Sequence, residues 1–175
     1  MKSGDLWRKI PQFPFSSKTR MLNGGYNSTL DEKGRFTFPT RLRESIAHTT
    51  KEEDISACEE LVVTRGIDRC LWAYPPDKWH TFAAKLENAS AMKQDVRLLQ
   101  RHFLGWAVVC EFDRGGRLAI PQALREWANL KRECVVMGLG ERIEIWDADT
   151  YRNYSGDTDE SDKVIAAAES LACFF

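Results

Sequence analysis

The sequence has no long apolar run and almost no net charge. No stretch reaches the roughly 18 to 20 apolar residues that a membrane-spanning helix needs, and the N-terminus lacks the apolar core of a secretory signal. Its 25 basic and 26 acidic residues leave a formal net charge of -1. We therefore expect an intracellular protein without membrane partners, in which any site for a polyanion is a local patch.

Cysteine pairing is also absent. The five cysteines are odd in number and none forms a Cys-x-x-Cys pair, so they are interpreted as reduced thiols of a cytosolic protein. The three histidines lie far apart, with no second ligand at metal-binding spacing. The sequence thus predicts no metal site. The cysteines are Cys58, Cys70, Cys110, Cys134 and Cys173, and the histidines are His48, His80 and His102.

Motifs of catalysis are missing as well. The chain has no Gly-x-x-x-x-Gly-Lys-Ser/Thr phosphate loop and no Gly-x-Ser-x-Gly nucleophile elbow. The acidic run GDTDESD at 156–162 lacks the spacing and the terminal glutamate of an EF-hand, so a solvated linker is the better interpretation. We expect neither an enzyme nor a cofactor or small-molecule substrate.

What the chain does contain is one motif written twice. DEKGRFTFP begins at Asp31 and DRGGRLAIP begins at Asp113, an offset of 82 residues. Further along, Gly66 corresponds to Gly138, so the offset has fallen to 72. The first copy therefore carries about ten extra residues, which we assign to the charged stretch TTKEEDISACEE as a surface-loop insertion.

Each copy is predicted to be a ββαββ unit followed by a helix. Apolar residues alternate on both sides of each D-x-x-G, as in strands with one buried face. The glycine can adopt positive φ and the aspartate can accept hydrogen bonds from turn amides, which predicts a hairpin-like corner. A proline then opens a short helix. The turn-forming residues are Asp31, Gly34, Asp113 and Gly116, and the prolines are Pro39 and Pro121.

These patterns divide the chain into five parts. Residues 1–20 have no clear period and form a flexible leader. The two units span 25–77 and 106–149, joined by a linking helix over 78–104 with an apolar stripe. Residues 150–175 form a helical and acidic C-terminal tail. Most tryptophans are expected in the core: Trp72, Trp79, Trp106, Trp127 and Trp146.

An arginine follows each turn directly, at Arg35 and at Arg117. The guanidinium fork can bond guanine O6 and N7, or a phosphate, in bidentate fashion. Each corner is only mildly basic, so a purely structural turn stays open for the aspartate and glycine. Repetition over several subunits would multiply phosphate contacts. The supporting cations are Lys33, Arg41, Arg43, Arg114 and Arg125.

Four segments between about Met21 and Tyr154 carry a family resemblance: GGYNSTLDEKGRFTFPTRLRE, LWAYPPDKWHTF, RHFLGWAVVCEFDRGGRLAIPQALREWA and IEIWDADTY. They resemble the MraZ family of bacterial transcriptional regulators, which are built from two SpoVT/AbrB-type domains. It implies an α+β fold of tandem AbrB-like units with flanking helices. In this double-split β-barrel, swapped hairpins of the two units interlock.

The resemblance also implies a function. It points to a sequence-specific DNA-binding regulator, a repressor of its own division and cell-wall gene cluster, on short direct repeats of promoter double-stranded DNA. A ring homo-oligomer, octamer-like, would act in the cytoplasm at the nucleoid. Arg35 and Arg117 become the first candidates for DNA contact, although the second corner reads Arg114-Gly115 where the first reads Glu32-Lys33. A ring scaffold or protein-interaction module that binds no DNA stays open, because the net charge is small and aromatics are abundant.

Overall fold

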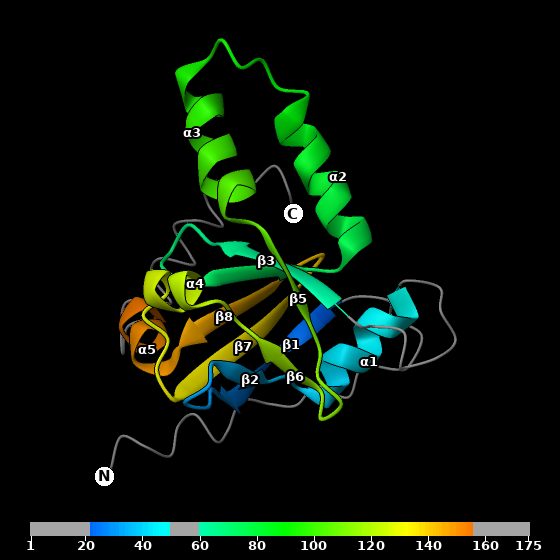
Figure 1. Cartoon of the computed structure of the whole chain (residues 1–175), viewed down its shortest axis with the longest axis vertical. Helices are drawn as coiled ribbons and strands as arrows, with labels where there is room; N and C mark the ends of the chain where they lie inside the picture. Colours follow the sequence, from blue (N-terminus) through cyan, green and yellow to red (C-terminus); the bar gives the residue numbers. More distant parts are fainter. Residues whose placement is uncertain (1–21, 50–59, 156–175) are drawn as a thin grey trace.

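A computed structural model describes residues 22–49 and 60–155 (Figure 1). Both halves have the predicted ββαββ order, and two helices and a 3-10 turn lie between them. The first half contains β1 (Leu22–Thr29), β2 (Arg35–Thr37), α1 (Thr40–Thr49), β3 (Glu60–Arg65) and β4 (Leu71–Tyr74). The second contains β5 (Val108–Glu111), β6 (Arg117–Ala119), α4 (Gln122–Trp127), β7 (Glu133–Gly140) and β8 (Ile143–Asp147), followed by α5 (Ala148–Ser155).

The two halves exchange their first strands. A six-stranded sheet has the order β1-β7-β8-β4-β3-β5, so β1 pairs with β7 of the other half and β5 pairs with β3. The second strands, β2 and β6, form an antiparallel two-stranded ribbon. This exchange confirms the α+β fold of tandem swapped-hairpin units.

An internal two-fold axis relates the halves. In the ribbon, Phe36 lies opposite Leu118, its own equivalent at the offset of 82. In the sheet, Trp72 lies opposite Glu144, its equivalent at the offset of 72. A two-fold axis passes between two equivalent residues that lie opposite each other. The axis therefore passes through both the ribbon and the centre of the sheet.

The core explains why one half alone is insufficient. Phe36 and Leu118 are both 0% exposed and pack in one cluster with Leu42 of α1 and Leu124 of α4. Burying such a side chain stabilises the fold by about 1.5–3 kcal/mol. Each half separately would lose these contacts and leave strand edges unpaired. Duplication within one chain supplies the missing partner.

The segment predicted as one linking helix is two helices. α2 (Pro76–Glu87) is capped by Asn88, and α3 (Gln94–Phe103) runs back toward the sheet before η3 (Leu104–Trp106) (Figure 1). The reversal brings the Phe103 ring to 5.3 Å from Phe82 and 5.0 Å from Trp72. A straight helix rises about 1.5 Å per residue and would carry Phe103 far from these rings. Aromatic packing therefore favours the hairpin.

Three of the five cysteines lie within the described residues. Cys70, Cys110 and Cys134 are buried free thiols. Burial raises the pKa of Cys70 to about 12 and that of Cys110 to about 11.

No helix within 22–49 and 60–155 is long and apolar enough to cross a membrane. The leader, the TTKEEDISACEE insertion, the acidic run, Cys58 and Cys173 lie outside the described residues, apart from the ends of the insertion stretch.

Candidate nucleic-acid interface

Corner 1, residues 31–35, is a closed hydrogen-bond circuit. Asp31 Oδ1 accepts from the backbone N–H groups of Lys33 and Arg35, both at 2.9 Å. Asp31 Oδ2 accepts from Arg35 Nε at 2.7 Å. Gly34, with φ of +76°, donates its N–H to the Asp31 carbonyl at 3.0 Å. The pKa of Asp31 is lowered, first by the Arg35 backbone N–H and then by its side chain.

Corner 2, residues 113–117, repeats this circuit. Asp113 Oδ1 accepts from the N–H groups of Gly115 at 2.8 Å and Arg117 at 3.0 Å, and Oδ2 accepts from Arg117 Nε at 2.8 Å. Gly116 has φ of +71°. The pKa of Asp113 is likewise lowered, chiefly by the Arg117 N–H. The sequence repeat is therefore a repeat of geometry, in which an aspartate fixes the arginine that follows it.

The two fixed arginines lie on the outward face of the ribbon. Arg35 is opposite Ala119 and Arg117 is opposite Thr37, so the arginines are diagonal neighbours across the strand pair, about 7–8 Å apart. Their side chains are 36% and 38% exposed. Among the described residues, the Nη groups of neither arginine form a hydrogen bond. Each guanidinium group is thus fixed through its Nε, while its Nη groups form no hydrogen bond among the described residues.

A helix of each half supports the corner of the other half. Arg125 of α4 lies against Gly34, where an added Cβ would be 2.7 Å from Arg125 Cζ. Arg125 Nε donates to the Ile120 carbonyl at 3.0 Å, and the Ile120 N–H donates to the Gly34 carbonyl at 3.0 Å. Arg43 of α1 lies against Gly116 in the same way. Both are partly buried, at the base of the corners.

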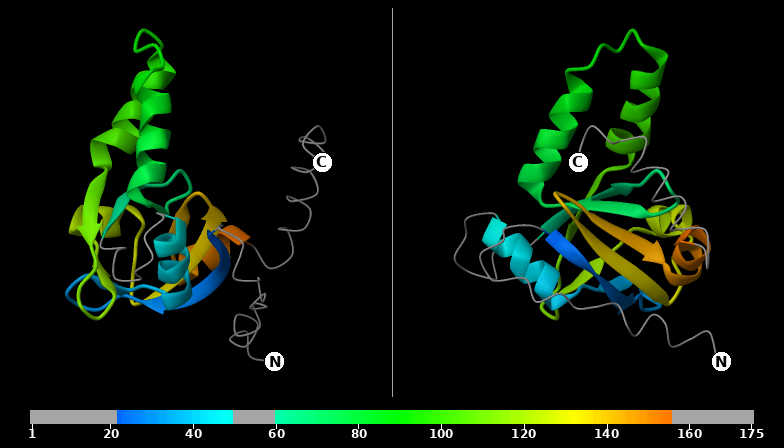
Figure 2. Two further views of the ribbon diagram at one scale, coloured as in Figure 1. Left: turned by 90° about the vertical axis from the view of Figure 1, so that its right-hand side faces the viewer. Right: turned by 180° about the vertical axis from the view of Figure 1, so that it is seen from behind.

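Both corners lie at one end of the molecule, beside the ribbon, and the α2–α3 hairpin projects from the opposite end (Figures 1 and 2). The structure thus brings most of the predicted cations to two sites on one shared surface, and places Arg41 on the exposed side of α1. Corner 1 receives Lys33, Arg35 and Arg125, and corner 2 receives Arg43, Arg114 and Arg117.

Two cations near corner 1 were missed by the sequence reasoning. Lys131 and Arg132 are exposed and line a hollow of about 650 Å³ together with Asp31 and Glu32. They precede β7, which pairs with β1 so that Glu133 is opposite Thr29. The residues before β7 must then lie beside the residues after β1. The strand exchange implied by the resemblance was the signal that could have located them.

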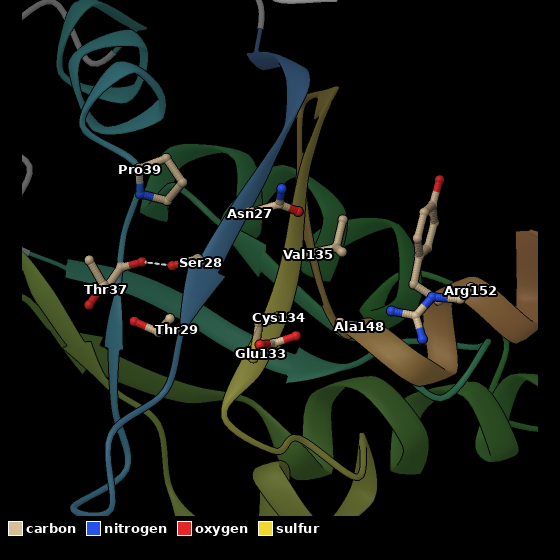
Figure 3. Close-up of a pocket in the computed structure, with 11 residues that line it drawn as sticks. Asn27, Ser28, Thr29, Thr37, Pro39, Glu133, Cys134, Val135, Ala148 and Arg152 are labelled. Carbon is tan, nitrogen blue, oxygen red and sulfur yellow. Dashed lines mark hydrogen bonds between the residues drawn. The ribbon is translucent and has the colours of Figure 1, made fainter. Parts of the chain in front are cut away.

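A second hollow lies between β1, β2, β7 and α5 and has a volume of about 600 Å³ (Figure 3). The Ser28 hydroxyl donates to the Thr37 carbonyl across it. Burial raises the pKa of the lining Cys134 to about 12, so this thiol is not an activated nucleophile. No group of three or more His, Cys, Asp or Glu in the described ranges is placed to hold a metal ion.

The strand exchange and the paired corners define a tandem AbrB-like protein. The family model of the MraZ protein, described as antitoxin-like, matches residues 21–102 and again 103–172. A protein of Thermoanaerobacter sp. (strain X514) named Transcriptional regulator MraZ is 38% identical over 146 residues, which are 83% of this chain and 94% of that protein. The chain belongs to the MraZ family, as the resemblance implied.

Proposed function

We propose that the protein is a transcriptional regulator, not an enzyme, that binds double-stranded DNA in a sequence-specific manner through its two arginine corners. The observation that carries the proposal is the pair of Asp-fixed arginines, Arg35 and Arg117, on one exposed ribbon face. Two-stranded β-ribbons fit the major groove of B-DNA. The name of the Thermoanaerobacter relative supports the regulatory role.

The Asp–Arg circuits prepare the guanidinium groups for binding. Each arginine is already held at Nε, so less side-chain freedom is lost when the Nη groups meet a base edge or a phosphate. Lys33 and Arg114 are exposed at the tips, where phosphate contacts would fix the register of the protein on the duplex. Arg43 and Arg125 act mainly by supporting the corners, because both pack against corner glycines.

Assembly of several copies would raise the affinity of these corners for DNA. A single chain with a formal net charge of -1 presents few phosphate contacts, whereas a ring of copies presents many at once. We therefore include a ring homo-oligomer on short direct repeats in the proposal. The protein would act as a repressor of its own gene cluster, in the cytoplasm and associated with the nucleoid.

The test is a fluorescence-anisotropy titration with the DNA upstream of the gene, at several salt concentrations between about 50 and 200 mM. Arg35→Ala and Arg117→Ala should each weaken specific binding by about 5- to 150-fold, the loss of one bidentate contact of 1–3 kcal/mol. The oligomer size should not change. Arg101→Ala is the matched control, because Arg101 is exposed on α3, away from the corners.

Wild-type affinity for DNA in both Arg35→Ala and Arg117→Ala would contradict the proposal that these arginines contact DNA. A ring scaffold is the second candidate function, because apolar side chains are exposed on α3 and β5: Leu98 is 63% and Val109 is 54% exposed. Absence of specific binding by the wild-type chain at every salt concentration would favour the scaffold.

A further inference from the structure

The outward face of the ribbon carries two exposed side chains besides the arginines. Side chains alternate along a strand, and Phe36 and Leu118 point inward, each 0% exposed. The residues on either side of them therefore point outward. They are Arg35 and Thr37 on β2, and Arg117 and Ala119 on β6. Thr37 and Ala119 are exposed, and neither corner circuit uses their side chains.

Each arginine is bent toward its own corner. The Asp31 carboxylate accepts from both the N–H and the Nε of Arg35, at 2.9 and 2.7 Å. The Asp113 carboxylate binds Arg117 in the same way, at 3.0 and 2.8 Å. A side chain whose Nε shares one carboxylate with its own backbone N–H lies beside the corner instead of extending away from the ribbon. DNA that meets these guanidinium groups therefore comes close to the shorter side chains of the same face.

The backbone that carries the two short side chains is held in place. The Thr37 carbonyl accepts a hydrogen bond from the Ser28 hydroxyl, and the Thr37 side chain points away from Ser28 (Figure 3). Among the described residues, the Thr37 hydroxyl itself forms no hydrogen bond. Ile120, which follows Ala119, donates its N–H to the Gly34 carbonyl at 3.0 Å. Such fixed positions suit the reading of base edges, because hydrogen bonds weaken steeply with misalignment.

These two residues break the two-fold symmetry of the ribbon face. At the offset of 82, Thr37 corresponds to Ala119, whereas Arg35 corresponds to an identical residue, Arg117. Two equivalent arginines alone would read a site that is symmetric about its centre. Across the strand pair, Thr37 is opposite Arg117 and Ala119 is opposite Arg35, with Cβ atoms about 4.5–5.5 Å apart. One arginine thus has a hydroxyl and a methyl beside it, and the other has only a methyl.

The spacing of the face suits separate base pairs. Alternate residues of a strand are roughly 7 Å apart, and stacked base pairs are about 3.4 Å apart. Along a strand that lies in the major groove, Arg35 and Thr37 therefore meet different base pairs. A threonine hydroxyl can bond a base edge there, and an alanine methyl packs against the thymine methyl.

We propose that Thr37 and Ala119 are specificity-determining residues of the DNA site. The Thr37 hydroxyl bonds a base edge beside the contact of Arg117, and the Ala119 methyl packs against a thymine methyl beside the contact of Arg35. Because the two side chains differ, the site read by one chain has a direction along the duplex. The inference rests on the DNA binding of the proposed function, but not on the ring.

Base-pair preferences of the full-length chain test this inference. The wild-type chain first selects its site from a pool of random-sequence duplexes. Anisotropy titrations then give the dissociation constant for each single base-pair substitution of that site, and its ratio to the constant of the selected site is the discrimination at that position. Thr37→Val should lower the discrimination at one position by about 2- to 12-fold, the loss of one hydrogen bond. Thr37→Ser keeps the hydroxyl and should retain it.

Exchange of the two side chains is the sharper test. Ala119→Thr should change the preferred base at the position related to that of Thr37 by the two-fold axis. The double variant Thr37→Ala with Ala119→Thr presents the wild-type face again after a half-turn on the duplex, so it should recover the wild-type preferences. Thr81→Ala is the matched control, because Thr81 is exposed on α2, away from the corners. Thermal unfolding checks that each variant is folded.

Unchanged discrimination at every position in Thr37→Val and Ala119→Thr would overturn the inference. An equal loss of affinity for all the duplexes would overturn it too, because a purely structural role has that effect, as would a double variant that does not recover the wild-type preferences. If the wild-type chain selects no site from the pool, the proposed function fails and the inference with it. If it selects a site that the single variants read identically, only the inference fails.

Discussion

The two corners share one hydrogen-bond circuit but differ in what surrounds it. Corresponding distances agree to about 0.1 Å, from 2.7 and 2.8 Å at the arginine Nε to 2.9 and 3.0 Å at the arginine N–H. The tips differ, because Glu32 and Lys33 cancel in corner 1 whereas Arg114 in corner 2 has no acidic neighbour at the tip. The supports differ too, because Arg125 has an acceptor for its Nε and Arg43 has none in the described structure.

This difference separates two roles within one motif. The aspartate, glycine and arginine set the shape of the corner, and they are the same in both copies. The side chains at the tip and the supporting arginine lie around this hydrogen-bond circuit rather than in it, and they differ between the two corners. We therefore expect substitutions of the circuit aspartates to act alike in both corners. Substitutions that disturb the tip or the supporting arginine should act unequally, and these include the corner glycines, because each glycine packs against the supporting arginine.

The largest effect is expected from the corner glycines. Alanine at φ near +70° costs about 1–2 kcal/mol in either corner. Gly34→Ala also displaces Arg125 and breaks its bond to the Ile120 carbonyl, which brings the loss to about 2–4 kcal/mol. Gly116→Ala displaces Arg43, whose Nε has no acceptor to lose in the described structure, so its cost stays near 1–2 kcal/mol.

Urea denaturation measures these free energies of unfolding. Gly105→Ala is the control, because an added Cβ there meets no atom within 4 Å, and its effect should stay within about 0.5 kcal/mol. A larger loss for Gly116→Ala than for Gly34→Ala would show that steric displacement, rather than the Arg125 hydrogen bond, separates the two corners.

The next prediction concerns pH and should make the corners indistinguishable. The pKa values of Asp31 and Asp113 both lie below 3.8, each chiefly because of the N–H of the following arginine. A carboxyl whose pKa is lowered on folding stabilises the protein above its unfolded pKa, and this contribution is lost as the pH falls through the folded pKa. The circuits should therefore persist at neutral pH and open only below pH 3.8.

A titration followed by the carboxyl carbon signals in NMR measures both midpoints, and Asp31→Asn and Asp113→Asn assign them. Both midpoints are expected below 3.8. A midpoint at or above 3.8 for one aspartate would mean that its circuit is open in solution, and the equivalence of the corners would then be lost.

Local pattern was enough to find the corners. D-x-x-G-R specifies which residue accepts, which takes positive φ and which side chain closes the circuit, and these interactions span only five residues. The ββαββ order was also readable, because alternation and helix-opening prolines are local signals. The strand exchange came from the family resemblance, since no local pattern says which copy of a strand is the partner.

Long-range contacts account for what the residues did not reveal. The break between α2 and α3 depends on Phe103 meeting Trp72 across the fold. Trp106 was expected in the core but is 37% exposed, and its ring lies against the Arg65 guanidinium. The support of Gly34 by Arg125 crosses from one repeat to the other. Each is a contact between segments far apart in sequence.

The smallest expected effect lies at the tips, and it sharpens the comparison. Arg114→Ala removes an uncompensated exposed charge, so the slope of log K against log salt for DNA binding should fall in magnitude by about 1. Lys33→Ala should change the slope less, because Glu32 already offsets part of the Lys33 charge. Both substitutions should weaken binding about equally on all sequences, as expected for phosphate contacts. Anisotropy titrations at four or more salt concentrations resolve the slopes. An equal or larger change for Lys33→Ala would assign the tip contact to corner 1 instead.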